Sequence, residues 1–260
     1  MTPSSPLVFI TGASSGIGQA LAGCFFEAGY CLALLARRTD AIESWAAGRG
    51  IPSARLGVYG ADVANVDAIV AAGQAVVAAQ GLPDIVIANA GISVGVDGGN
   101  RADLEVLAQT FAVNNVGLAA TFQPFVEAMR ARGSGRLVGI ASVAGVRGLP
   151  GHGAYCASKA GVIAYCESLR GELRDSGVKV VTICPGYIDT PLTQGNRYGM
   201  PFLMQADAFA ERSRRAIEAG DSLRFIPWQM GIIARLMKVL PNAWYDRLAA
   251  GRGRKRRRGQ

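Results

Sequence analysis

Three polar side chains that could move a proton lie close together in the sequence: Ser142, Tyr155 and Lys159. Tyr155 and Lys159 are four residues apart, so on a helix they share one face. A tyrosine hydroxyl titrates near ~10, and a neighbouring ammonium favours the phenolate and lowers that pKa. Ser142 can hydrogen-bond a substrate oxygen and hold it against the Tyr155 hydroxyl. The three residues therefore predict proton exchange with an oxygen atom.

A Tyr-x-x-x-Lys pair alone is a modest signal, because an exposed pair on a solvated helix gives the same pattern. A second stretch, Thr11–Gly18, supports the chemical interpretation. It follows the apolar run Leu7–Ile10 and precedes a helical pattern through Gln19 to Ala28. Glycines between a strand and a helix let the backbone approach a pyrophosphate, and the helix N-terminus offers free N–H groups. The sequence thus predicts a dinucleotide site.

The next apolar run, Tyr30–Leu35, is a predicted strand that leads into Ala36, Arg37 and Arg38. In a dinucleotide fold the residue after this strand meets the adenosine ribose. A carboxylate there binds the 2′-hydroxyl of NAD, whereas an arginine suits the 2′-phosphate of NADP. The alternative is a solvated pair of loop arginines. We expect NADP(H) to be preferred to NAD.

Strands alternate with helices along most of the chain. Further strands are expected at 54–58, 84–88, 135–141 and 178–183, and helices at 40–47, 66–79, 104–130 and 155–174. This alternation predicts an α/β fold with a single doubly wound parallel sheet, a Rossmann fold with helices on both faces. Asn114 and Asn115 fall inside a predicted helix, where asparagine is unfavourable, so at least one should have a tertiary role.

Composition bounds the class of protein. Half of the 260 residues are hydrophobic and 18% are charged, as in a globular protein with a sizeable core. The five cysteines form no CxxC pair, and His152 is the single histidine, so we expect reduced thiols, no metal site and a cytoplasmic location. No secretory signal and no membrane span are expected from the sequence.

Taken together, these motifs resemble those of the short-chain dehydrogenase/reductase superfamily over roughly residues 7–190. The resemblance implies catalytic roles for Ser142, Tyr155 and Lys159, and a helix asparagine, Asn114, that holds a proton-relay water. It also implies cofactor contacts, including Tyr155 and Lys159 themselves. The other implied contacts are Gly12, Ser14, Ser15, Gly16, Ile17, Gly18, Arg37, Arg38, Asp62, Val63, Asn89, Ala90, Gly91, Pro185, Gly186, Ile188 and Thr190.

The resemblance implies an NADP-dependent oxidoreductase that transfers a hydride between the nicotinamide of NADPH and a carbonyl or secondary alcohol. An apolar segment at 192–207, with Tyr198 and Phe202, falls where this family places its substrate lid, which suggests an apolar substrate. Core packing explains these side chains about as well. A second hypothesis is a catalytically silent dinucleotide sensor or scaffold. Both Tyr155 and Lys159 are present, which favours the enzyme.

The resemblance also implies a homodimer or homotetramer in which the helices 104–130 and 155–174 pair across an axis. Both helices carry apolar residues beyond one stripe. These are Phe111, Phe122, Phe125, Ile163, Tyr165 and Leu169. The C-terminus departs from the family pattern, because Phe225–Leu240 replaces the usual final strand and puts the usual tetramer contact in doubt.

We divide the chain into a catalytic domain at 1–224, a hydrophobic extension at 225–250 and a basic, disordered tail at 251–260. Apolar residues recur at helical spacing in the extension, and six cations follow. We expect the helix to pack over the substrate pocket. The alternative is a segment lying on an anionic membrane surface. A nucleic-acid partner is not expected, because no recognition motif precedes the basic run.

Overall fold

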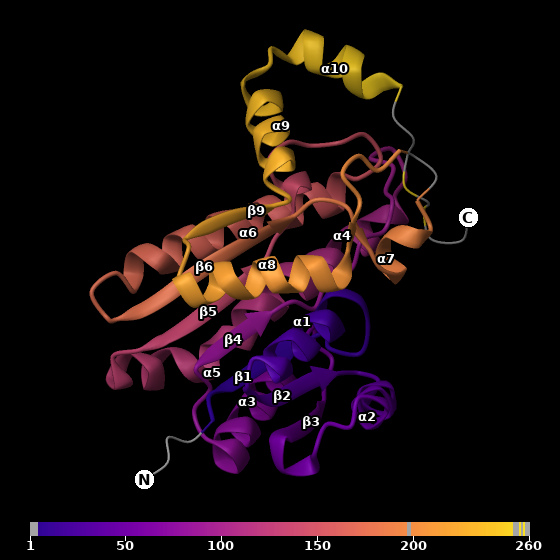
Figure 1. The fold of residues 1–260 in the computed structure, drawn as a ribbon. Helices are drawn as coiled ribbons and strands as arrows, with labels where there is room; N and C mark the ends of the chain where they lie inside the picture. The colour runs from indigo at the N-terminus through magenta and orange to yellow at the C-terminus, as the bar shows by residue number, and fades with distance from the viewer. Residues whose placement is uncertain (1–4, 197–198, 252–254, 256, 258–260) are drawn as a thin grey trace.

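The computed structural model describes residues 5–196, 199–251, 255 and 257. One seven-stranded sheet crosses it in the order β3-β2-β1-β4-β5-β6-β9, with every neighbouring pair parallel (Figure 1). The strands are β1 (Leu7–Thr11), β2 (Cys31–Ala36), β3 (Leu56–Gly60), β4 (Ile85–Ala88), β5 (Gly135–Ile140), β6 (Val178–Pro185) and β9 (Leu223–Ile226). The predicted fold class is confirmed. The strand order changes direction between β1 and β4, the point where such sheets bind ligands.

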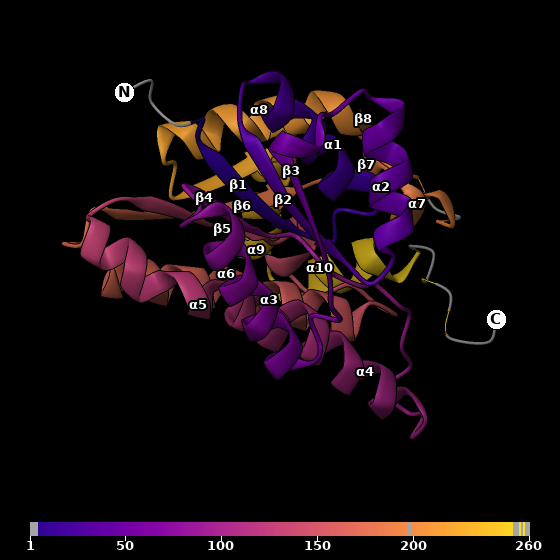
Figure 2. The same cartoon turned by 90° about the horizontal axis from the view of Figure 1, so that it is seen from below.

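Helices cover both faces of the sheet (Figure 2). One face carries α1 (Gly16–Glu27), α2 (Thr39–Gly48) and α8 (Ala206–Ala219), and the other carries α3 (Val66–Gln80), α5 (Gly117–Arg132) and α6 (Gly153–Glu172). Each face has its own hydrophobic core. All five residues of β1 are buried, since a parallel strand covered on both sides reads as an uninterrupted apolar run.

The long helix predicted at 104–130 consists of three parts. α4 (Asp103–Phe111) leads into a π-helical turn, η2 (Ala112–Val116), and then into α5. At the junction, a Cβ on Gly117 would lie 2.6 Å from the carbonyl oxygen of Val63, so the helix approaches that loop more closely than a side chain permits. π-helical turns often occur at functional sites. This one carries both asparagines.

The sequence predicts six strands of the sheet and does not predict the seventh, β9. It extends the sheet next to β6, with Pro185 opposite Ile226. Leu223 and Arg224 are exposed, and only Phe225 and Ile226 are buried. With four residues and one apolar pair, the strand has too little pattern to be recognised. It also spans the predicted boundary between residues 224 and 225.

Two helices follow β9 and form what we call the arm: α9 (Trp228–Val239) and α10 (Asn242–Ala250). They lie beyond the sheet, at the opposite end of the molecule from the N-terminus (Figure 1). α9 contacts β9 through small residues, and a Cβ on Gly231 would lie 2.7 Å from the Cβ of Phe225. Larger apolar side chains of the arm, such as Leu236 and Trp244, are exposed. Met230 of α9 nevertheless lies against Gly186, so the packing of the arm over a substrate pocket stays a prediction.

Arg147 of the body contacts both helices of the arm. Arg147, in the loop between η3 (Val143–Gly145) and α6, donates to the carbonyl oxygens of Met237 and Leu240. Its guanidinium carbon lies 3.9 Å from the centre of the Tyr245 ring. The Tyr245 hydroxyl in turn donates to the carbonyl oxygen of Gly148. The turn between α9 and α10 is therefore fixed to the loop that joins Ser142 to Tyr155.

The predicted lid is only partly regular. It contains β7 (Ile188–Asp189), α7 (Pro191–Gln194) and β8 (Met204–Gln205), and β7 pairs with β8. Phe202 is about half exposed, and Tyr198 lies outside the described residues. No helix in the described ranges has the length and apolar character needed to cross a bilayer.

Three residues expected to leave a second apolar face on the long helices are core residues instead. Phe122 and Phe125 are fully buried under the sheet, and Leu169 is buried beside them. Tyr165 stays exposed on α6. The apolar surplus on these helices is smaller than the sequence suggests.

Candidate active site

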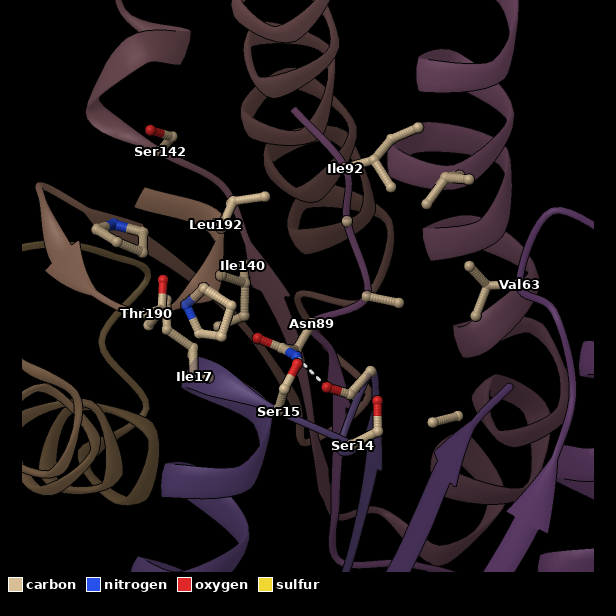
Figure 3. A pocket seen from close by; sticks show the side chains of 18 of the residues that line it. Ser14, Ser15, Ile17, Val63, Asn89, Ile92, Ile140, Ser142, Thr190 and Leu192 are labelled. Atoms are coloured by element: carbon tan, nitrogen blue, oxygen red, sulfur yellow. Dashed lines mark hydrogen bonds between the residues drawn. The ribbon is translucent and has the colours of Figure 1, made fainter. Parts of the chain in front are cut away.

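A cleft of about 500 Å³ opens at the carboxyl ends of β1, β2, β4, β5 and β6. Its lining includes every cofactor-binding residue that the sequence predicts except Gly18. Figure 3 shows side chains from four separate segments, among them Ser14, Asn89, Ser142 and Thr190, around this space. The topology thus brings together residues that are up to about 180 positions apart in the chain, as expected for a site at the end of a parallel sheet.

The glycine turn after β1 is shaped by close backbone contacts. A Cβ on Gly12 would lie 2.8 Å from the Cα of Ala90, and its φ of +69° favours glycine. A Cβ on Gly18 would lie 2.3 Å from the carbonyl oxygen of Gly12, so Gly18 sets how closely α1 packs on the turn, outside the cleft lining. The side chain of Ser15, the N-cap of α1, makes no capping hydrogen bond. The first amides of α1 therefore suit an anion such as a pyrophosphate.

Asn89 ties the end of β4 to this turn. Its backbone N–H donates to Thr11 Oγ1 at 3.2 Å, and its side-chain Nδ2 donates to the carbonyl oxygen of Thr11 at 2.9 Å. These bonds satisfy polar groups at the strand ends and fix the spacing between β1 and β4. Asn89 lines the cleft mainly as a support for the glycine turn.

The far end of the cleft carries two arginines. Arg37 lies 3.7 Å from Asp62, and Arg38 donates to Ser14 Oγ at 3.5 Å. Both are exposed, so these contacts are weak and leave the guanidinium groups able to bind an anion. Ala36, at the end of β2, supplies no carboxylate to oppose one. The charges at this end of the cleft therefore suit a phosphate group bound near Arg37 and Arg38.

The predicted catalytic residues meet at the opposite end. Ser142 directly follows β5, accepts a hydrogen bond from Ala144 N at 3.1 Å, and hydrogen-bonds Tyr155. Loss of water around the phenol raises the pKa of Tyr155 to about 12, and the Ser142 contact acts against this rise. We expected Lys159 to lower that pKa, but burial of the phenol raises it instead. Lys159 Nζ lies 5.9 Å from the centre of the Tyr155 ring.

Lys159 is buried and donates to the carbonyl oxygen of Ile140 at 2.7 Å. Burial lowers its pKa to about 8. The amine therefore changes charge close to neutral pH. A pair in which burial raises the pKa of a tyrosine and lowers that of a lysine suits proton exchange.

Asn114 supports the site from outside the cleft lining. Its Oδ1 accepts from Ile92 N at 2.9 Å, and its Nδ2 donates to Ile92 O at 3.0 Å and to Ser158 Oγ at 2.9 Å. Asn115 Nδ2 donates to Ser158 O at 2.9 Å. Both asparagines therefore have the tertiary role that the sequence indicates. A Cβ on Gly91 would lie 3.3 Å from Asn114 Oδ1 and 3.4 Å from Lys159 Nζ.

Sequence reasoning missed part of the lining. The additional residues are Leu35, Ala61, Ile92, Gln109, Val113, Ile140, Ala141 and Pro191, whereas Ala36 stands at the predicted ribose position and Leu192 and Thr193 lie in the predicted lid. Most are apolar and carry no motif, so burial rather than chemistry places them there. Thr193 had a local signal, because Thr190 and Thr193 form a capping box at α7.

In the described part of the chain, no three His, Cys, Asp or Glu residues lie close enough together to hold a metal ion. His152 is buried just before α6, and burial lowers the pKa of its ring. Its Nδ1 lies 3.0 Å from the carbonyl oxygen of Pro150. We assign it a structural position in the loop.

Comparison with known proteins supports this picture. A model of the short chain dehydrogenase family matches residues 6–200. A protein of Myxococcus xanthus described as an uncharacterized oxidoreductase is 38% identical over 245 residues, which cover 92% of this chain and 94% of that protein.

Two solved structures are similar throughout. A 3-ketoacyl-ACP reductase from Sinorhizobium meliloti has a TM-score of 0.78 and 27% identity, covering 88% of this chain and all of that one. An alcohol dehydrogenase from Thermococcus sibiricus, solved with 5-hydroxy-NADP, has a TM-score of 0.76 and 25% identity, covering 85% and 96% of the two chains.

Proposed function

The chain belongs to the short-chain dehydrogenase/reductase family, and we propose that it is an NADP(H)-dependent oxidoreductase that interconverts a carbonyl and a secondary alcohol. One observation carries the proposal: Ser142, Tyr155 and Lys159 line the same end of one cleft, whose other end has the glycine turn and two arginines. An anion-binding end and a proton-exchanging end in one cleft suit a dinucleotide and a small substrate.

The residues divide the work of this reaction. When bound, the dinucleotide supplies or accepts the hydride. Ser142 holds the substrate oxygen next to Tyr155, and the Tyr155 hydroxyl donates its proton to that oxygen in the reductive direction. Lys159, as an ammonium, lowers the cost of the resulting phenolate. Asn114 holds the backbone of Ile92 through two hydrogen bonds.

The preference for NADP rests on charge at the adenosine end. Arg37 and Arg38 line the cleft, and Ala36 offers no carboxylate that would repel a 2′-phosphate. A guanidinium binds a phosphate through charge-assisted hydrogen bonds. The similar alcohol dehydrogenase that was solved with an NADP analogue is in keeping with this choice.

The substrate end suggests an apolar molecule. Ile92, Val113 and Leu192 are apolar residues of the cleft lining. Such side chains favour an alkyl or aromatic group beside the reacting carbonyl, because apolar surface leaves water on binding. We assign the chain to the cytoplasm and expect a homo-oligomer, in which the exposed Leu104, Leu107 and Tyr165 of α4 and α6 are covered by a second copy.

The test is a screen of apolar aldehydes, ketones and secondary alcohols with NADPH or NADP, read by absorbance of the reduced cofactor. We expect turnover with at least one substrate class and its loss in Tyr155→Phe. Tight NADPH binding without turnover of any substrate would support a dinucleotide sensor instead. Absence of NADPH and NADH binding would reject both functions.

A further inference from the structure

The arm exposes several large apolar side chains on both of its helices. Trp228, Leu236 and Val239 of α9 and Trp244 and Leu248 of α10 are between 61% and 78% exposed. Ile232 lies between the first two and is 45% exposed. The spacing places the α9 residues on one helix face. We call these six residues the apolar stripe.

The other sides of both helices are already used. α9 buries Met230, Gly231 and Ala234 against the body, and α10 buries Tyr245 and Ala249. The side chains of the stripe lie on the remaining, exposed sides of the two helices. Exposed apolar surface of this extent in a folded domain marks an interaction site.

The charges around the stripe have one dominant sign. Arg235, Lys238 and Arg247 are exposed on the two helices, and Asp246 is the single acidic residue in either of them. The chain then continues into six cations at 252–258. Two of these are engaged on the body, since Lys255 donates to the Leu192 carbonyl and Arg257 pairs with Asp103 at 2.7 Å. Arg235 lies 5.5 Å from the centre of the Phe225 ring, and together with Lys238 and Arg247 it leaves the two helices with a net positive charge.

We propose that the arm is a docking element for an anionic bilayer surface. Two exposed tryptophans on short helices suit the headgroup region, where amphipathic rings sit with one side in water. Basic residues beside an apolar stripe add attraction to anionic lipids, and a helix of this kind lies in the interface rather than across the membrane. A second copy of the chain is the competing occupant. It is disfavoured because pairing two such surfaces would bring the basic residues of the arms together.

The conformation of the arm is fixed by contacts within the protein itself. Arg147 binds two carbonyl oxygens at the end of α9 and stacks on Tyr245, which fixes the angle between the helices. A preformed surface loses little conformational freedom on binding. The same loop runs from Ser142 to Tyr155, so docking would hold the catalytic end of the cleft close to the lipid surface.

The experiment measures partition of the full 260-residue chain into vesicles by co-sedimentation. Phosphatidylcholine vesicles with phosphatidylserine are compared with pure phosphatidylcholine, at low and at physiological salt. We expect binding to the anionic vesicles that weakens with salt, with a blue shift in tryptophan fluorescence. Trp244→Gln/Leu248→Gln should lower partition at least about tenfold, because it removes two buried apolar groups.

Two matched variants serve as controls. Val66→Gln/Leu223→Gln changes two exposed apolar residues elsewhere and should bind like the wild type. Arg235→Glu/Lys238→Glu should abolish the preference for anionic vesicles, whereas Arg101→Glu/Lys179→Glu, at exposed sites on the body, should weaken it less.

Failure to bind anionic vesicles at low salt would overturn the proposal, and so would equal binding by the Trp244/Leu248 variant. If that variant instead changed the mass in solution scattering, the stripe would be an interface between copies. Because these readouts need no turnover, they stand apart from the proposed activity.

Discussion

Helices α1 and α9 are both twelve residues long, and both follow a strand of the same sheet. α1 packs on the sheet beside α8 and buries six residues, whereas α9 rests on β9 and buries three. Each makes its closest contact through a glycine, Gly18 or Gly231. Two similar sequence patterns thus end in different environments, because the number of neighbouring elements, and not the pattern, decides how much of a helix is buried.

Substituting one tyrosine in the cleft and one in the arm should give the largest difference in effect between the two regions. Tyr155→Phe should lower turnover by about 10²- to 10⁴-fold, because it removes the proton donor, while NADPH still binds. Tyr245→Phe should leave turnover within a few-fold and cost about 1 kcal/mol of stability, because it loses the hydrogen bond to the Gly148 carbonyl. Steady-state kinetics and denaturant unfolding measure both. Equal losses of turnover would show that the arm takes part in the chemistry.

The glycine contacts give the next largest effect. A Cβ on Gly18 would meet the backbone of Gly12, which cannot turn aside, so Gly18→Ala should destabilise by about 3 kcal/mol. Gly231→Ala meets the Phe225 side chain, and we expect about 1 kcal/mol. Gly171→Ala, in open space on α6, should be neutral or slightly stabilising. Urea unfolding ranks the three. A cost at Gly231 as large as that at Gly18 would mean that both helices are packed equally tightly.

Buried and exposed lysines should differ in their pH dependence. The pKa of Lys159 is lowered to about 8 from an ordinary value of 10.5. Between these values the unfolded chain binds more protons than the folded one, so the stability contributed at this residue rises with pH. From about pH 7.5 to about pH 9.5 we expect the free energy of unfolding to rise by about 2 kcal/mol relative to Lys159→Met.

Lys238, exposed on α9, supplies the control for this measurement. The free energy of unfolding of Lys238→Met should follow that of the wild type across the same pH range. A parallel pH profile for the wild type and Lys159→Met would contradict the lowered pKa of Lys159.

Substituting one arginine in the cleft and one in the arm should give the smallest difference, measured in the KM for the cofactor. Arg37→Ala should raise the KM for NADPH about tenfold and that for NADH less than about twofold, because one charge-assisted contact to the 2′-phosphate is lost. Arg235→Ala, on the arm near Phe225, should change neither constant. Steady-state kinetics with both cofactors decides this. Equal use of NADPH and NADH by the wild type would reject the assignment of Arg37.

The elements around the cleft could be predicted because their signals are local. A buried apolar run followed by glycines specifies β1 and the turn after it, and the spacing of Tyr155 and Lys159 puts both on α6. The position of two asparagines inside a predicted helix also indicates that they have a tertiary role. The sequence could not show that this role includes a π-helical turn, because Asn114 binds the backbone of Ile92, 22 residues away.

The C-terminal part could not be predicted to the same degree. β9 has four residues, and two of them are exposed at the edge of the sheet. In α9 the buried residues are Met230 and the small Gly231 and Ala234, while most of the large apolar residues that dominate the pattern are exposed. A helical apolar period reports that a face is apolar. It does not report what covers it.

The contacts of Arg147 with the arm limit which substitutions can be accepted there during evolution. Two of its contacts are to carbonyl oxygens, those of residues 237 and 240, which every amino acid supplies. Those positions are free to change without loss of the attachment. The stacked ring at Tyr245 is not replaceable in that way. Among homologues, position 147 and position 245 should therefore change together, while 237 and 240 drift. The contacts of Arg147 therefore constrain the side chain at position 245 and leave those at positions 237 and 240 unconstrained.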